Sequence, residues 1–247
     1  NGGKGGALTL SVGNAQTGAG GGIQATAGQT SGGAQGGFVR INGGVSAPNG
    51  GQGGYISLVS GAGTARSSGK IVVKTVNAGT KGISGALEFT SGASTSGNSG
   101  EIKLTTGTGV LGKSGDITLN VGSGNTGTGG LVGITAGTTT AGSGVGGAIT
   151  LTSGDSNDGN TGAIDLITDA GAAVTGAIGL TTGDSTGADS GTLTLETGAS
   201  TNGGKGGALT LSVGNAQTGA GGGIQATAGQ TSGGAQGGFV RINGGVS

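Results

Sequence analysis

Cysteine, histidine, methionine and tryptophan are absent from this 247-residue sequence, which also contains a single proline. Without cysteine there is no disulfide scaffold. Without histidine and cysteine, most routes to acid–base, nucleophilic and zinc chemistry are closed. Ten basic residues balance ten acidic ones, so the basic excess typical of nucleic-acid binding is missing. No apolar run approaches the roughly 20 residues that span a bilayer. The sequence therefore predicts a protein that is not an enzyme, binds no nucleic acid and does not cross a membrane.

Glycine is the most informative residue that is present, at 70 positions of 247. A collagen strand is excluded, because glycine does not recur at every third position and proline is nearly absent. A wide globular interior is also excluded, because three phenylalanines and one tyrosine supply too little bulk. Disorder is the remaining alternative for a chain that is 31% hydrophobic. The placement of the apolar residues decides against it.

The chain contains an internal repeat with a period of 201 residues, because residues 1–46 recur without one change as residues 202–247. We therefore expect residues 1–201 to be one full repeat unit and residues 202–247 to be the start of the next. Such identity is typical of a stretch of a longer tandem array.

A shorter motif recurs within the 201-residue unit: glycine, any residue, aliphatic, any residue, aliphatic, two variable residues and usually glycine. It occupies residues 6–13, 21–28, 37–44, 54–61, 69–76, 85–92, 100–107, 115–122, 130–137, 147–154, 162–169, 176–183 and 191–198. Thirteen motifs in 201 residues give a mean spacing of about 15.5 residues.

The two aliphatic positions of each motif alternate with polar ones, and this period of two is typical of a half-buried strand. The sequence therefore predicts an all-β fold, a parallel β-solenoid (β-helix) with coils of about 15 residues and a thin core, continuous over residues 1–247. The predicted core ladder is Leu8, Leu10, Ile23, Ala25, Val39, Ile41, Ile56, Leu58, Ile71, Val73, Leu87, Phe89, Ile102, Leu104, Ile117, Leu119, Val132, Ile134, Ile149, Leu151, Ile164, Leu166, Ile178, Leu180, Leu193 and Leu195. Glycine at the corners of each coil would permit positive φ.

Charge is segregated within the unit. Six basic residues, from Lys4 to Lys81, precede every acidic residue, and all ten acidic residues lie between Glu88 and Glu196. Neighbouring copies are therefore predicted to associate laterally with a stagger near half a unit, and copies are also expected to continue end to end. A cell-surface or matrix polysaccharide is a further candidate partner.

Two groups of residues are candidate sites. Phe38 and Tyr55 share one outward position on successive motifs, which predicts a surface aromatic stack or a patch for lateral or ligand contact. Asp155, Asp169 and Asp184 fall near the same corner of three successive coils. They form either a solvated acidic corner or a calcium site, because carboxylate oxygens are ligands that Ca²⁺ accepts. No other cofactor is predicted.

Phrases such as SGDITLNVG and GGAITLTSG resemble the β-solenoid repeats of secreted filamentous adhesins of the filamentous-haemagglutinin type. They are also similar to the Gly/Ser/Thr-rich repeats of very large cell-surface proteins of microbes and algae. The resemblance covers the whole chain, although the spacing is shorter than in the adhesin family. It implies an extracellular or cell-surface location and a structural or adhesive role.

Two functional hypotheses follow from these patterns. The first is a structural protein that forms a long extracellular β-solenoid filament from tandem 201-residue repeats, without catalysis. The alternative is an adhesin stalk or a repeat array that binds ice or another ligand, and the threonines at outward positions motivate it. Charged residues interrupt the threonine columns, so ordinary β-propensity explains these threonines better than an ice-binding face.

Overall fold

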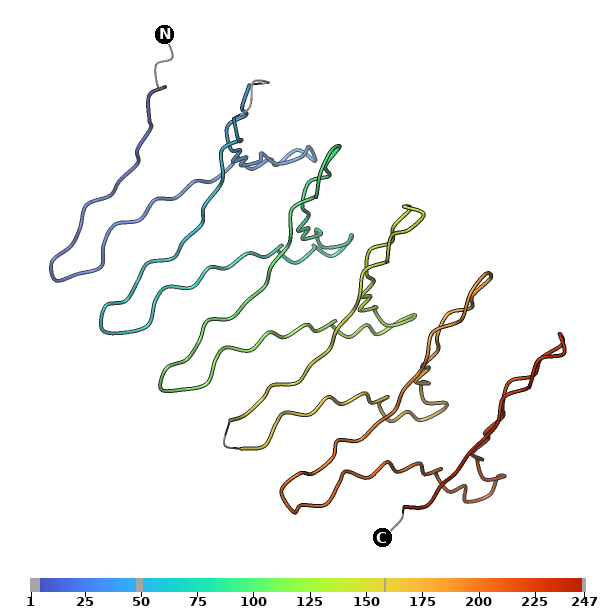
Figure 1. Cartoon of the computed structure of the whole chain (residues 1–247). Coiled ribbons are helices and arrows are strands. Elements are labelled where there is room, and N and C mark those ends of the chain that lie inside the picture. Colours follow the sequence, from blue (N-terminus) through green and yellow to red (C-terminus); the bar gives the residue numbers. More distant parts are fainter. Residues whose placement is uncertain (1–4, 48–50, 158, 246–247) are drawn as a thin grey trace. The chain divides into compact units, whose positions relative to one another are not determined.

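The computed structural model describes residues 5–47, 51–157 and 159–245, and over these ranges the chain contains neither a helix nor a β-strand (Figure 1). The prediction of an all-β solenoid, or β-helix, is therefore wrong. The chain is largely coil, with short bends at regular intervals. No helix able to cross a membrane occurs in these residues.

The surface area shows how open the chain is. Its accessible surface is 24370 Å² for a mass of 22.2 kDa. A compact protein of this mass would expose about 9,400 Å², and the fully unfolded chain about 32,000 Å². The structure therefore lies nearer to the unfolded limit, and within the described residues no side chain is buried.

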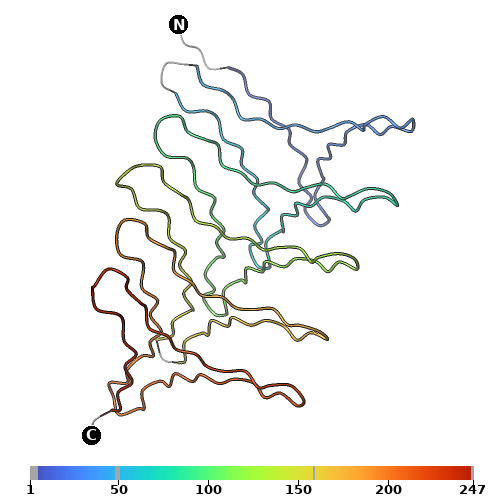
Figure 2. The same cartoon turned by 90° about the vertical axis from the view of Figure 1, so that its right-hand side faces the viewer.

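The chain divides into two units, Asn1–Asn120 and Val121–Ser247. In each unit the described motifs run as extended segments, and the chain turns back on itself between them (Figure 2). A bend lies in nearly every inter-motif segment, for example at residues 31–34, 95–97 and 201–203. The short period found in the sequence is therefore also the period of the backbone.

The predicted core ladder faces solvent. Its large side chains are exposed by between 50% at Leu87 and 87% at Leu8. Apolar residues between motifs are more open still, with Leu111 at 103%. The motif aliphatics are thus only partly covered, and among the described residues they do not form a buried interior.

The absence of a solenoid from the described residues is explained by the hydrogen bonds as well as by the side chains. In a solenoid each strand donates to and accepts from the coils above and below it. Among the described residues, the backbone hydrogen bonds instead close short loops within the chain, and no ladder joins like positions of successive motifs. Two aliphatic side chains per motif bury too little area to order some 15 residues, many of them glycines with a high backbone entropy.

Candidate functional site: the glycine-closed loops

The segment between two motifs forms a loop whose ends meet at glycine. We call it a glycine-closed loop and define it as running from the last residue of one motif, usually the closing glycine, to the opening glycine of the next. In seven of these loops the opening glycine N–H donates to the carbonyl oxygen of the closing glycine. These loops span residues 28–37, 44–54, 61–69, 137–147, 154–162, 198–207 and 229–238, with N···O distances of 2.8 to 3.3 Å.

The opening glycine is tightly enclosed at the base of the loop. A Cβ atom on Gly147 would lie 3.1 Å from the nitrogen and 3.3 Å from the oxygen of Gly137. A Cβ on Gly54 would lie 2.9 Å from the nitrogen of Gly44. The closing glycines of these two loops, Gly137 and Gly44, have open space at the same position. In these two loops a side chain at the opening glycine would crowd the backbone opposite, whereas an added methyl group fits at the closing glycine. In the loops over residues 61–69 and 154–162 a Cβ on the opening glycine would have contacts of 3.5 Å or more.

The residue just before the closing glycine is covered by the same contact. Of the nine described residues that are partly rather than fully exposed, eight occupy this position, the sixth after an opening glycine. They are Ala27, Gly43, Ser60, Ser91, Thr106, Ala136, Ser153 and Ala228. The most protected points of the chain are therefore the loop bases, although the aliphatic pairs carry the stronger hydrophobic signal.

The tips of the loops depend on glycine and on hydroxyl groups. Among the described residues six glycines have positive φ, where a side chain is strained, and all six lie between motifs: Gly33, Gly82, Gly97, Gly127, Gly203 and Gly234. Hydroxyl oxygens accept from backbone N–H groups nearby, as in Gly159 to Ser156 at 2.9 Å and Ala188 to Ser185 at 3.2 Å. The expectation that corner glycines permit positive φ is confirmed at these six tips, outside the context of a solenoid.

The two copies of the repeated segment adopt the same local structure. The loop closes at 3.0 Å between Gly37 and Gly28, and at 2.9 Å in the second copy. The tip glycine has φ of 75° at Gly33 and 80° at Gly234. Because the two copies lie in different units of the chain, the loop geometry follows from the local sequence.

An arginine lies over an aromatic ring on the outward face of the third motif. The guanidinium of Arg40 is 5.1 Å from the centroid of Phe38, and Arg241 is 4.8 Å from the ring of Phe239 in the second copy. Residues two apart in an extended segment point to the same side. This cation–π contact supports the sequence-based assignment of these positions to one face.

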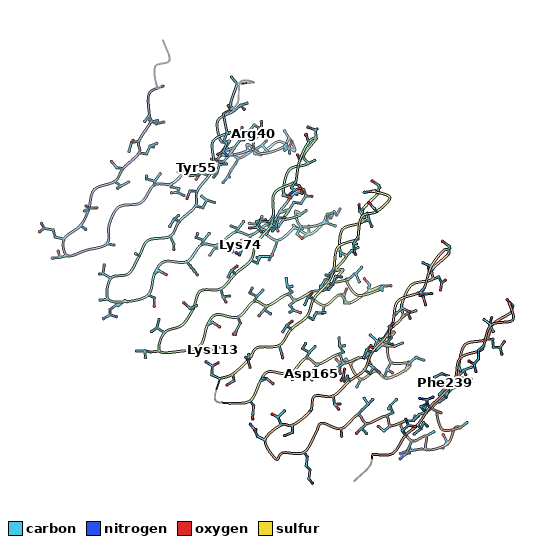
Figure 3. All side chains as sticks on the ribbon, in the orientation of Figure 1. Arg40, Tyr55, Lys74, Lys113, Asp165 and Phe239 are labelled. Atoms are coloured by element: carbon cyan, nitrogen blue, oxygen red, sulfur yellow. The ribbon has the colours of Figure 1, made fainter. Side chains whose placement is uncertain are left out.

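Figure 3 shows Arg40, Tyr55, Lys74, Lys113, Asp165 and Phe239 along the trace. The predicted aromatic stack pairs Phe38 with Tyr55. The guanidinium of Arg40 lies over the ring of Phe38, and Tyr55 is 90% exposed. The stack stays a prediction, and the contact that the structure records at this face is the one between arginine and phenylalanine.

The three aspartates predicted as an acidic corner lie at the starts of three loops. The carboxylate of Asp155 accepts from the N–H of Ser156 at 2.7 Å, and that of Asp169 accepts from Ala170 at 2.8 Å. Asp184 is exposed. Over the described ranges, no three acidic groups gather closely enough to hold a metal ion. The calcium site stays a prediction.

One ion pair is present in the part of the chain that the structure describes. The Nζ atom of Lys113 lies 2.9 Å from Oδ2 of Asp116, and both side chains are largely exposed. The residues that the structure describes line no pocket. Between residues of the described ranges, the other charged side chains form no ion pair.

The chain is without a detected relative. No protein-family model, no curated protein and no solved structure matches it. The resemblance to filamentous adhesins and large cell-surface repeat proteins remains a resemblance of repeat style.

The loop bases are the feature that sequence analysis missed. Their signal was present in the sequence, because almost every motif both begins and ends with glycine, and small or β-branched residues precede the closing one. The sequence-based prediction places these glycines at solenoid corners, where glycine serves only to permit positive φ. Their larger role is to let two backbone segments meet.

Proposed function

We propose that this chain is part of a structural, non-catalytic protein that forms extracellular fibres from tandem 201-residue repeats. The observation that carries the proposal is the recurrence of one local structure, an extended motif followed by a glycine-closed loop, with the same geometry in both copies of the repeated segment. A chain built in this way gains length with each motif without needing a common core.

The loops support an extensible fibre. The loop over residues 137–147 encloses ten peptide steps behind one hydrogen bond of 2.8 Å between its ends. Fully extended, these steps span about 33–36 Å. A single backbone hydrogen bond contributes about 0.5–1.5 kcal/mol, so modest tension opens such a loop and releases that length. When the tension falls, the loop closes again as soon as the N–H of the opening glycine re-forms its hydrogen bond to the carbonyl oxygen of the closing glycine.

The extracellular location rests on the resemblance to secreted and cell-surface repeat proteins. The fibre is proposed to consist of copies of this chain, joined end to end or side by side, with a matrix polysaccharide as a further partner. The structural role is favoured over a ligand-binding array, because the regular feature of the structure is the backbone loop and not a row of like side chains.

Immunogold electron microscopy of intact cells with an antibody against residues 1–46 tests the proposal. Each fibre should carry several gold particles in a row. Their spacing should not exceed about 700 Å, the extended length of 201 residues. Gold confined to the cell interior, or one particle per isolated molecule, would contradict the proposal.

A further inference from the structure

Two basic positions of the third and fifth motifs are matched by acidic residues at the same positions of the eleventh and thirteenth motifs, whereas Lys70 and Asp169 have no charged counterpart. Arg40 is the third residue after opening glycine Gly37, and Asp165 is the third after Gly162. Further along the same two stretches, Lys74 is the fifth residue after Gly69, and Glu196 is the fifth after Gly191. Both pairs are separated by eight motifs.

The loop between these motifs repeats the relation. Arg66 is the fifth residue after Gly61, and in the loop eight motifs later Asp189 is the sixth residue after Gly183 and Asp184 the first, so the nearest acidic residue is displaced by one position. One offset therefore brings three cationic positions opposite acidic ones. In the next loop it places Lys81 opposite Lys205, the one like-charge pair of this stretch.

All of these side chains are exposed in the structure, and none is in an ion pair among the described residues. Residues 40–81 contain five basic and no acidic residues, and residues 155–196 contain seven acidic and no basic residues. Such segments attract each other strongly only when they come within about a Debye length, roughly 10 Å at 0.1 M salt. The exposed aliphatic pairs of the motifs provide apolar surface that contact between copies would cover.

We propose that two copies of this chain associate side by side and in parallel, offset by eight motifs, so that Arg40, Arg66 and Lys74 of one copy lie opposite Asp165, Asp189 and Glu196 of the other. A parallel arrangement keeps each opening glycine beside an opening glycine, so extended motifs lie beside motifs and loops beside loops. The offset refines the lateral association of copies, and in that sense it rests on the proposed fibre function.

A charge-swap experiment at one pair tests the register. R40D places two acidic groups together and should weaken self-association about 2- to 30-fold, because one exposed ion pair is lost and a repulsion of similar size replaces it. R40D/D165R should restore the original affinity. R40D/E101R has the same net charge as the swap, but Glu101 does not face residue 40 at this offset, and its affinity should stay as weak as that of R40D.

The measurement is sedimentation of the 247-residue chain over a range of concentrations at low ionic strength. Recovery by R40D/D165R and not by R40D/E101R supports the register. Equal recovery by both variants, or by neither, overturns it. A chain that stays monomeric at every concentration also overturns it, including the case in which the two charged segments pair within one molecule.

These outcomes are independent of the test of the proposed function. A monomeric chain in solution would remove the register and leave extracellular, gold-labelled fibres unaffected. Gold confined to the cell interior would remove the fibre function without altering the response of sedimentation to the charge swap.

Discussion

Gly147 offers the sharpest test of the glycine-closed loop. Its N–H donates to the carbonyl oxygen of Gly137 at 2.8 Å and closes a loop of ten peptide steps. In G147A the new Cβ would lie 3.1 Å from the nitrogen of Gly137 and 3.4 Å from Cβ of Ala136. The nearest of these atoms belongs to the backbone, so the base of the loop must open by a few tenths of an ångström.

The matched control is G137A in the same loop. A Cβ at this position meets nothing within 4 Å, and φ is not positive. Alanine at such a position stabilises the closed form by about 0.4–1 kcal/mol, because it reduces the freedom of the open chain. The two glycine-to-alanine changes are therefore expected to act in opposite directions.

Amide hydrogen exchange at residue 147 measures the difference, after correction for the intrinsic rate of each amide. Loss of a hydrogen bond worth about 0.5–1.5 kcal/mol should speed exchange about 2- to 13-fold in G147A. Gain of about 0.4–1 kcal/mol should slow it about 2- to 5-fold in G137A. If both substitutions slow exchange, the close approach at the loop base is absent in solution and the reasoning fails.

Three further predictions concern the loop tip, the outward face and the whole chain. In the loop over residues 28–37, G33A places alanine at φ of 75° and should bring the exchange rate of the Gly37 N–H close to that of an open amide. The neighbouring variant G32A has open space and no positive φ, so it should leave this exchange rate slow. Equal effects of the two substitutions would contradict the role of the loop tip. F38A removes the ring beneath Arg40 and should abolish the ring-current shift of the arginine side chain in NMR spectra. The control variant Y55A should leave that shift unchanged. A ring-current shift that survives in F38A would contradict the contact between Arg40 and Phe38. When a single chain of 247 residues is stretched in optical tweezers, it should extend smoothly towards a contour length of about 820–890 Å. The reason is that each described loop closure consists of one backbone hydrogen bond. Discrete unfolding steps at high force would contradict this expectation.

The positions of the loops could be predicted from the sequence, but the close approach of two backbone segments at the loop base could not. Motif spacing located the bends, and glycine frequency anticipated positive φ at tips such as Gly33 and Gly97. Sequence analysis did not anticipate that Gly54 lies against Gly44, because close approach of two backbone segments leaves no mark other than the small residues themselves. The cation–π contact of Arg40 could have been found, since it joins residues two apart on one face.

The error in the fold has a specific origin. Alternation at pairs such as Leu87 and Phe89 shows which side chains share a face, but it does not show what covers that face. In the structure these side chains stay 50% and 70% exposed. Period-two alternation is equally compatible with an extended segment that has no neighbour.

The sequence by itself determined the features that depend on nearby residues: the 15.5-residue rhythm, the loop closures and the tip glycines. These features are the same in both copies of the repeated segment, since the interactions that produce them span no more than about ten residues. Only the tertiary structure decided whether motifs pair with one another, because pairing requires hydrogen bonds and buried area between distant segments. In the described residues the closing glycines accept hydrogen bonds within seven of the loops, and the aliphatic side chains remain in water.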